Sequence, residues 1–267
     1  MPGLAERSIQ KRSVMGISDD QYRRFSKLTF DDFRRMAQDE SLSKYEKIGL
    51  PDSYREGKEE FIFQNIVANL TLLKERRKVV LDIGPGCTDL PHMIIDLCRE
   101  NDHTLLLVDS AEMLAHLPDG GFIRKFAARY PDCEPLFHDY TSKVDVLLVY
   151  SLLHAVFVEG NIWDFLDRSL ELLAEGGEML IGDVPNISMR RRFFSSANGV
   201  RFHQQFMDTQ DLPEVHFNSL ERNQIDDSVI LALLTRARNQ GFDAYVLPQH
   251  RDLPFANRRE DILIRRP

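Results

Sequence analysis

Apolar residues along the chain fall into short continuous runs that alternate with stretches of helical periodicity. The runs predict strands buried on both faces of a sheet, at residues 79–83, 105–109, 144–151, 178–183, 242–247 and 261–264. The helical periodicity predicts helices at residues 90–98, 161–173 and 226–238, the second ended by Gly176-Gly177 and the third by Gly241. Strands and helices in this alternation predict parallel βαβ units.

One further strand is ambiguous between the runs at 105–109 and 144–151. Residues 122–128 are the first candidate, because the remaining gap before Val144 leaves room for a crossover helix of ordinary length. The alternative places the strand at Glu134–His138. The two choices differ in which residue ends the strand, Ala127 or Ala128 in the first case and Asp139 in the second.

The N-terminal part of the chain carries no strand pattern. Residues 1–17 mix charge, serine and glycine without periodicity, which predicts a mobile tail. Helical patterns fill residues 18–75, with starts at Ser18 and Thr29, a short helix at 41–49, a turn at 50–55 and an amphipathic helix at 59–73. We therefore expect a helical cap before the sheet domain, which takes up residues 76–267.

The pattern breaks at residues 187–225, which show neither period 2 nor sustained helical periodicity. This insertion comes directly after the run at 178–183 and is longer than an idle loop in a compact domain usually is. It contains three consecutive arginines, Arg190, Arg191 and Arg192, in an otherwise acidic chain. Because it leaves the carboxyl end of a strand, the insertion is well placed to cover a binding site.

Length, charge and cysteine content narrow the class of protein. A chain of 267 residues can form one large α/β domain with insertions, or a domain with a small cap. A formal net charge of -8 argues against nucleic acid as the main partner. The 3 cysteines show no metal-ligand spacing and suit a reducing compartment, and no apolar run is long enough to span a membrane. We expect a cytoplasmic protein without a metal site.

The chemistry that the sequence suggests most clearly lies after the run at 79–83. Gly84-Pro85-Gly86 turns the chain sharply into the next helix, whose first N–H groups are free to bind a ligand. The next strand ends in Asp109, about 25 residues further on, where a carboxylate can accept hydrogen bonds from the two hydroxyls of a ribose. Together these features predict a site for a nucleotide-like cofactor.

Four segments of the chain resemble the Rossmann-like (class I) S-adenosylmethionine-dependent methyltransferases: VVLDIGPGC, LLLVDSAEML, VDVLLVYSLLH and LLAEGGEMLIGD. The resemblance covers residues 79–183. It implies a seven-stranded, mostly parallel sheet with helices on both faces and an antiparallel last strand. The third small position of the family's glycine loop is Thr88 here, a departure that counts more against a dinucleotide than against a methyl donor without phosphate.

The resemblance also implies which residues hold the methyl donor. The expected cofactor-binding residues are Asp82, Gly84, Pro85, Gly86, Asp109, Ser110, Tyr150, Ser151 and Tyr54. Tyr54 would act from an N-terminal lid, together with Tyr45 and Arg55. The family's acidic contact to adenine is missing if the third strand ends at Ala127 or Ala128, and is Asp139 under the alternative.

The acceptor side of the site is less defined, because methyl transfer from a sulfonium mainly requires that two ligands are aligned. His154 and Asp183 are candidate bases if the acceptor is protonated, and each could equally be structural. The substrate-binding candidates are Arg190, Arg191, Arg192, Asn186 and His203, and Arg258 and Arg259 could reach the same pocket. Residues 30–65 and the strings YSLLH and IGDVPN are also similar to methyltransferases of bacterial surface-polysaccharide biosynthesis, and this likeness favours a small, anionic, sugar- or phosphate-containing acceptor. The alternatives are a noncatalytic adenosyl-binding module and an NAD-dependent enzyme.

Overall fold

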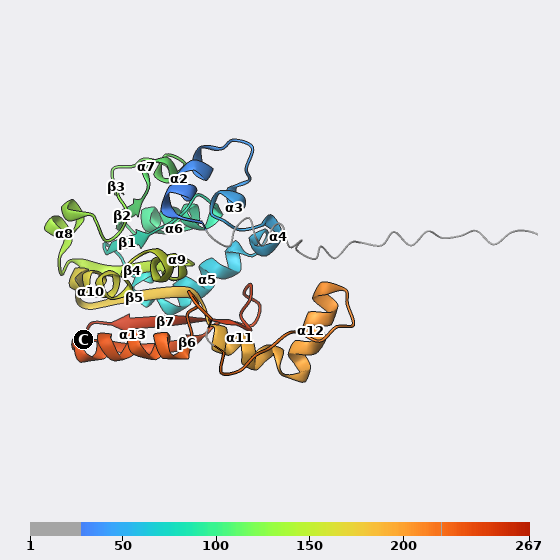
Figure 1. Cartoon of the computed structure of the whole chain (residues 1–267). Coiled ribbons are helices and arrows are strands. Elements are labelled where there is room, and N and C mark those ends of the chain that lie inside the picture. The colour runs from blue at the N-terminus through green and yellow to red at the C-terminus, as the bar shows by residue number, and fades with distance from the viewer. Residues whose placement is uncertain (1–27, 220) are drawn as a thin grey trace, which may run out of the picture.

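The apolar runs of the chain form one seven-stranded sheet in a computed structural model that describes residues 28–219 and 221–267 (Figure 1). The strands are β1 (Val79–Ile83), β2 (Thr104–Asp109), β3 (Ile123–Ala127), β4 (Val144–Tyr150), β5 (Leu173–Pro185), β6 (Asp243–Pro248) and β7 (Arg259–Arg265). Their order in space is β3-β2-β1-β4-β5-β7-β6, and β7 alone runs antiparallel to its neighbours. The predicted fold class, a Rossmann-like α/β sheet with an antiparallel last strand, is confirmed.

Helices cover both faces of this sheet (Figure 1). Successive strand residues point to opposite faces, so Val80 and Leu105 pack with the helices of one face, while Leu81 and Leu106 pack with those of the other. The first face carries α5 (Glu59–Asn69) and α6 (Asp89–Glu100), and the second carries α8 (Glu134–Tyr140), α10 (Ile162–Leu172) and α13 (Asp227–Asn239). Burial on both sides explains why the strands appear as continuous apolar runs.

The third strand is β3, which confirms the first candidate and shows that the alternative at Glu134–His138 is wrong. Ala127 lies opposite Asp109 in the parallel β2–β3 pair. Residues 134–140 form helix α8, because Pro135 is compatible with the first turn and Leu136 and Tyr140 bury one side of it. Asp139 is consequently an exposed helical residue bonded to His138, away from any strand end.

The glycine pair Gly176-Gly177, predicted to end the helix before the fifth strand, does not do so. Helix α10 already ends at Leu172, and Gly176 and Gly177 lie within β5. Pairing with β4 shifts in register after Val144, so residues 174–177 bulge out of the sheet. A Cβ on Gly177 would lie 2.8 Å from the carbonyl oxygen of Ala174, which explains why glycine occupies this bulge.

The N-terminal helices pack against the sheet domain. They are α2 (Phe30–Gln38), α3 (Lys44–Lys47) and α4 (Asp52–Arg55), and α5 is followed by the 3-10 helix η1 (Thr71–Lys74). The predicted start at Thr29 is confirmed by a capping box with Asp32, whereas the tail at 1–17 and the start at Ser18 lie outside the described residues. Residues 52–55, predicted as a turn, form a single helical turn, and the helix predicted at 59–73 ends at Asn69.

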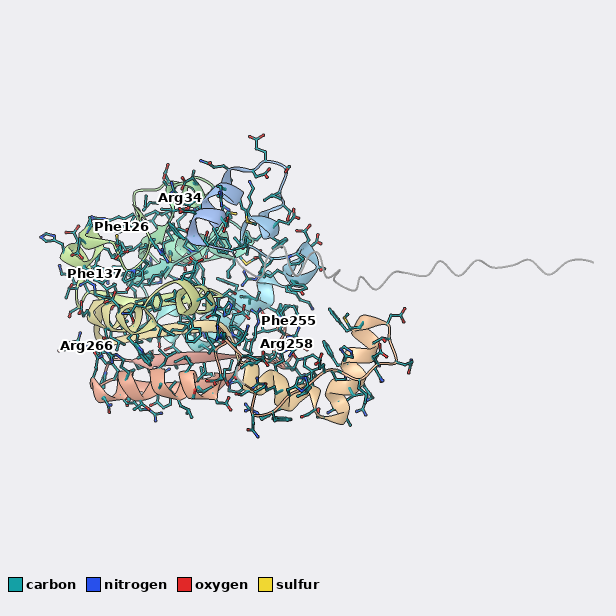
Figure 2. All side chains as sticks on the ribbon, viewed as in Figure 1. Arg34, Phe126, Phe137, Phe255, Arg258 and Arg266 are labelled. Atoms are coloured by element: carbon teal, nitrogen blue, oxygen red, sulfur yellow. The ribbon has the colours of Figure 1, made fainter. Side chains whose placement is uncertain are left out.

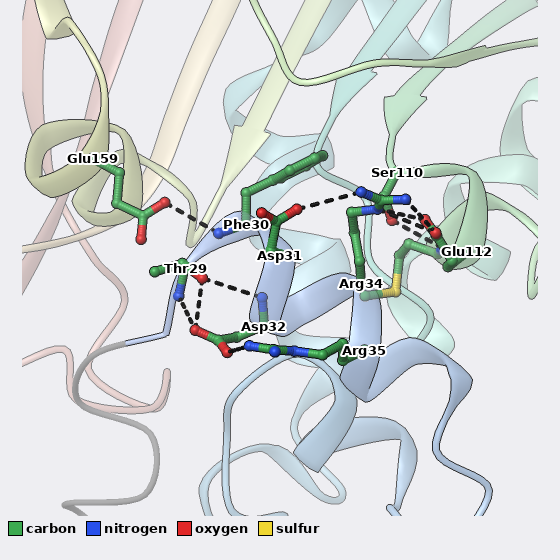
Figure 3. Close-up of polar contacts among 10 residues, drawn as sticks. Thr29, Phe30, Asp31, Asp32, Arg34, Arg35, Ser110, Glu112 and Glu159 are labelled. Carbon is green, nitrogen blue, oxygen red and sulfur yellow. Dashed lines mark hydrogen bonds and ion pairs between the residues drawn. The ribbon is translucent and has the colours of Figure 1, made fainter.

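Polar contacts tie α2 to the sheet domain (Figure 3). The Arg34 guanidinium donates hydrogen bonds from Nε and Nη2 to the carboxylate of Glu112, in α7 (Ala111–Leu114). The backbone N–H of Phe30 donates to Oε2 of Glu159, the last residue of α9 (Leu153–Glu159), at 3.1 Å. The N-terminal segment therefore bridges the ends of β2 and β4, the two strands that flank β1, because α7 follows β2 and α9 follows β4.

The insertion at 187–225 contains two helices, α11 (Ile187–Phe194) and α12 (Ala197–Met207), where no regular structure was predicted. Their aromatic residues pack on one another, with Phe202 5.6 Å from Phe193 and 5.7 Å from Phe206 between ring centroids. They project away from the sheet beyond the carboxyl end of β5, the strand that they follow (Figure 1). Packing within the insertion explains why its periodicity does not match that of the sheet-covering helices.

In the part of the chain that the structure describes, every helix is too short or too polar to cross a membrane.

Candidate active site

The glycine loop after β1 has the predicted strand–turn–helix geometry. Gly84 and Gly86 have φ angles of +69° and +71°, which only glycine adopts easily. A Cβ on Gly84 would lie 2.9 Å from Leu152, and a Cβ on Gly86 would lie 2.9 Å from Ile48. Both positions therefore require glycine for conformation and for space. Pro85 lies half-buried between them, and Thr88 is buried at the start of α6.

Asp109 at the end of β2 directly contacts this loop. The backbone N–H of Gly86 donates to Oδ2 of Asp109 at 3.4 Å, and the N–H of Ser110 donates to Oδ1 at 2.7 Å. Burial raises the pKa of Asp109 to about 6. The loop and the carboxylate are therefore in direct contact at the ends of β1 and β2. The Ser110 hydroxyl accepts from the N–H of Met113 and caps α7.

Asp82 lies beneath the loop, within β1. It is 4% exposed, and burial together with the charge of Asp109 raises its pKa to about 8. At neutral pH Asp82 is therefore mostly protonated. A buried neutral carboxyl group thus precedes the loop, within electrostatic reach of the charged Asp109.

The N-terminal segment covers the loop from above. Ile48 follows α3 and contacts Gly86, and Lys44 forms an ion pair with Asp89 at 2.5 Å. Glu59 at the start of α5 accepts a hydrogen bond from the N–H of Asp89 at 2.7 Å. Tyr45 is buried in this segment. The sequence patterns did not single out Ile48 or Glu59, because both occupy ordinary positions of helical stretches.

A second polar cluster lies at the carboxyl ends of β4 and β5. The Ser151 hydroxyl donates to Oδ2 of Asp183 at 2.5 Å, and the Arg259 guanidinium from β7 forms an ion pair with the same oxygen. Arg55 at the end of α4 donates to the Ser151 hydroxyl at 2.9 Å. Ser151 and Asp183 have φ angles of +59° and +60°, a conformation that costs free energy in residues with a side chain.

Asp261 of β7 is hydrogen-bonded to the backbone of this cluster. Its Oδ1 accepts from the N–H of Asp183 at 2.8 Å and from Nε2 of Gln249 at 2.9 Å, and its Oδ2 accepts from Nδ2 of Asn65 at 3.2 Å. The Tyr150 ring packs on Gly182, where a Cβ would lie 2.5 Å from the ring. Burial, with the charges of Asp183 and Asp261, raises the pKa of Tyr150 well above its usual value. The Tyr150 hydroxyl therefore stays protonated and can donate hydrogen bonds.

A small cavity joins this cluster to the N-terminal segment. It is lined by residues of α4, α5, β4, β5, the β6–β7 loop and β7, among them Tyr54, Arg55, Tyr150, Asp183, Phe255 and Arg259. The Tyr54 and Phe255 rings meet edge to face, with centroids 4.6 Å apart. Two guanidinium groups and one carboxylate thus face a shared space at the carboxyl edge of the sheet, where ligands gather in open α/β sheets.

His154 lies in the first turn of α9, half-buried. Its Nδ1 atom is buried and has no hydrogen-bond partner among residues 28–219 and 221–267. Burial, together with the positive charge of Arg259, lowers the pKa of His154. The ring is therefore neutral at neutral pH, and one of its nitrogens can accept a proton.

The three arginines of the insertion have different surroundings. Arg190, Arg191 and His203 line a pocket of about 390 Å³ between α11, α12 and residues 213–221. Within this pocket Arg191 forms an ion pair with Glu221 at 2.6 Å, whereas Arg192 forms an ion pair with Asp227 at 2.5 Å. Asn186 caps α11 through its side-chain oxygen and is 1% exposed.

Aromatic and guanidinium groups connect this pocket to the small cavity. The Arg258 guanidinium lies 5.7 Å from the ring centroid of Phe194, which lines the pocket, and 4.3 Å from that of Phe255, which lines the cavity. Arg258 and Phe255 lie close together beside α11 (Figure 2). The pocket of the insertion and the polar cluster are consequently neighbours.

Several solved structures share the fold, although no family model and no curated protein sequence matches the chain. The plantazolicin methyltransferase BamL, in complex with a triazolic desmethylPZN analog and SAH, is 15% identical with a TM-score of 0.54, over 89% of this chain and 96% of that one. A SAM dependent methyltransferase from Aquifex aeolicus is 11% identical with a TM-score of 0.52, over 90% and 100%. The CurJ carbon methyltransferase is 13% identical with a TM-score of 0.53, over 92% and 68%. The chain thus has the Rossmann-like class I fold of S-adenosylmethionine-dependent methyltransferases.

Proposed function

We propose that this protein is an S-adenosylmethionine-dependent methyltransferase. The observation that carries the proposal is the contact between Gly86 and Asp109, which joins the glycine loop and a carboxylate into one site at the carboxyl edge of the sheet. The residues fit an adenosyl ligand for two reasons. Gly84 and Gly86 have no side chain that would keep a ligand away from the backbone, and Asp109 offers acceptors for the ribose hydroxyls. Solved methyltransferases of the same fold, one of them with bound SAH, support the proposal.

In this proposal the donor lies across the ends of β1, β2 and β4. Asp109 accepts hydrogen bonds from the ribose, the loop from Gly84 to Gly86 allows close approach, and Asp82 supports the loop from below. Ser110, Tyr150 and Ser151 line the path of the donor, and Tyr54 and Arg55 close over it from the N-terminal lid. Ile48 and Leu152 lie against the loop glycines and so border this path.

When bound, S-adenosylmethionine supplies an activated methyl group, which is transferred to an acceptor atom aligned with the carbon–sulfur bond. The protein then needs to orient the acceptor, exclude water and receive a proton where the acceptor carries one. The neutral ring of His154 can accept that proton. The Asp183 carboxylate, fixed by Ser151 and Arg259, can orient a hydroxyl or accept the proton in its place.

We further propose a small anionic acceptor, with a phosphate, carboxylate or sugar acid group, held between the cavity and the pocket of the insertion. Arg259 and Arg258 lie on the cavity side of this path, and Arg190 and Arg191 line the pocket beyond Phe194. Guanidinium groups suit oxyanions because they donate paired hydrogen bonds. His203 and Asn186 belong to the same region, with Asn186 in a supporting role through its hydrogen bonds to Asp227 and Glu260.

Calorimetric titration of the purified protein tests the donor assignment. We expect binding of S-adenosylmethionine and of S-adenosylhomocysteine, and no heat with NAD. Binding of NAD alone would replace the proposal by an NAD-dependent enzyme. A third outcome is that both adenosyl ligands bind but mass spectrometry detects no methylated product after incubation with anionic metabolites. That outcome would favour a noncatalytic adenosyl-binding module.

A charge-removal variant of the pocket tests the acceptor assignment. Arg190→Ala combined with Arg191→Ala should raise the KM for the acceptor by about tenfold or more and leave donor affinity unchanged, because both residues line the pocket and not the donor site. Arg192→Ala is the matched control, since Arg192 pairs with Asp227 outside the pocket lining. Equal loss of donor affinity and acceptor affinity in the double variant would show that the arginines are structural.

A further inference from the structure

Glu59 is a buried carboxylate of which only one oxygen is used. The residue is 3% exposed, at the start of α5. Its Oε2 accepts from the N–H of Asp89, whereas Oε1 is buried without a hydrogen-bond partner among residues 28–219 and 221–267. A buried carboxylate oxygen is normally satisfied by a donor, so this one calls for a donor from outside the described residues, either a water molecule or a ligand.

The position of Glu59 links it to the proposed donor site. Asp89 is the first residue of α6, directly after the glycine loop. Burial raises the pKa of the Cys87 thiol to about 11, and the negative charges of Asp109 and Glu59 both add to this effect while Lys47 opposes it. One residue of the loop therefore lies within the electrostatic reach of both carboxylates.

Lys44, a cation near Glu59 in the described part of the chain, does not neutralise it directly. Lys44 is close enough to contribute electrostatically, but its Nζ bonds to Oδ2 of Asp89 at 2.5 Å. A ligand that carries its own cation would complete the cluster. An adenosyl ligand whose ribose is held at Asp109 extends its other end along the loop, and in S-adenosylmethionine that end carries an ammonium group.

We infer that Oε1 of Glu59 accepts a hydrogen bond from the α-ammonium group of the donor, so that the protein selects adenosyl thioethers and sulfonium ions that carry an amino-acid end. The inference rests on the proposed function. A primary ammonium group offers three donors and a positive charge, which matches a buried carboxylate oxygen without a partner. The competing explanation is that Glu59 serves only as a cap for α6, through its bond to Asp89.

The variant Glu59→Gln separates these explanations. Its amide oxygen can still accept from the N–H of Asp89, while its amide nitrogen carries no charge and turns a donor toward the ammonium group. Glu60→Gln is the matched control, because Glu60 is the adjacent residue, exposed and bonded to Gln64. The probes are S-adenosylhomocysteine and 5′-methylthioadenosine, which lacks the amino-acid end.

We expect Glu59→Gln to weaken S-adenosylhomocysteine binding by about tenfold or more while 5′-methylthioadenosine binds as it does to the unaltered protein. Glu60→Gln should change neither. Unchanged affinity for S-adenosylhomocysteine in Glu59→Gln would overturn the inference, as would an equal loss for both probes with a lower melting temperature, which a cap alone predicts.

A second measurement changes the ligand and uses the unaltered protein. The desamino analogue of S-adenosylhomocysteine should bind the unaltered protein more weakly than the parent compound by the same factor as Glu59→Gln. Equal affinity of the two compounds overturns the inference but leaves the methyl donor assignment intact. If the unaltered protein binds neither S-adenosylhomocysteine nor 5′-methylthioadenosine, the proposed function itself is wrong.

Discussion

Asp109→Ala is expected to weaken S-adenosylmethionine binding by about 10- to 150-fold. Hydrogen bonds to a charged acceptor contribute about 1.5–3 kcal/mol, and about 1.4 kcal/mol corresponds to a tenfold change in affinity. Burial of Asp109 beside the loop excludes the water that would otherwise replace these bonds. Calorimetric titration of the variant measures the loss. Affinity equal to that of the unaltered protein would remove Asp109 from the donor site.

The pH dependence of binding gives a second measure of the same group. Because the pKa of Asp109 is about 6, its carboxylate is lost as pH falls through that value, and donor affinity should fall with it. In Asp109→Ala this part of the pH dependence should disappear. Glu112→Ala serves as the control: Glu112 is a nearby acidic residue of α7 whose ion pair with Arg34 lies at the surface (Figure 3). We expect its donor affinity to be unchanged.

Asp261→Ala is expected to lower the free energy of unfolding by about 3 kcal/mol or more. Asp261 is 0% exposed and accepts hydrogen bonds from Asp183, Gln249 and Asn65. Each buried donor left without an acceptor costs about 1–3 kcal/mol. Relief of repulsion between Asp261 and Asp183 offsets part of this cost. Urea denaturation monitored by circular dichroism measures the change.

Asp252→Ala is the control for this variant, because Asp252 is an exposed residue of the β6–β7 connection that leads into β7. Its unfolding free energy should stay within about 0.5 kcal/mol of the unaltered protein. If Asp261→Ala lowers the free energy of unfolding by no more than this control does, the three donors find other acceptors. Asp261 then does not support the left-handed backbone at Asp183.

The sheet could be predicted from the sequence because its strands are buried on both faces. Val79–Ile83 and Val144–Tyr150 stand out as apolar runs whatever surrounds them. Helices α11 and α12 could not be predicted in the same way, because Phe194 and Phe202 pack within the insertion and not against the sheet. The bulge at Gly177 was also missed, since a glycine pair after a helical stretch usually marks its end.

The candidate site was predictable where it depends on local geometry and not where it depends on tertiary pairing. The glycine loop and Asp109 belong to one βαβ unit, so spacing along the chain brings them together. The pairing of Arg259 with Asp183 depends on the antiparallel register of β7 on β5, which places Arg259 opposite Pro185. Glu59 and Glu60 look alike in the sequence, and only the fold distinguishes the buried one from the exposed one.

The contact between Tyr150 and Gly182 imposes a constraint on how this chain can diverge. The ring occupies the place of any Cβ at position 182, so alanine there is compatible only with a smaller residue at position 150. Homologous chains are therefore expected to change the two positions together. Those that retain the tyrosine should retain the glycine, even where the rest of β4 and β5 has been replaced.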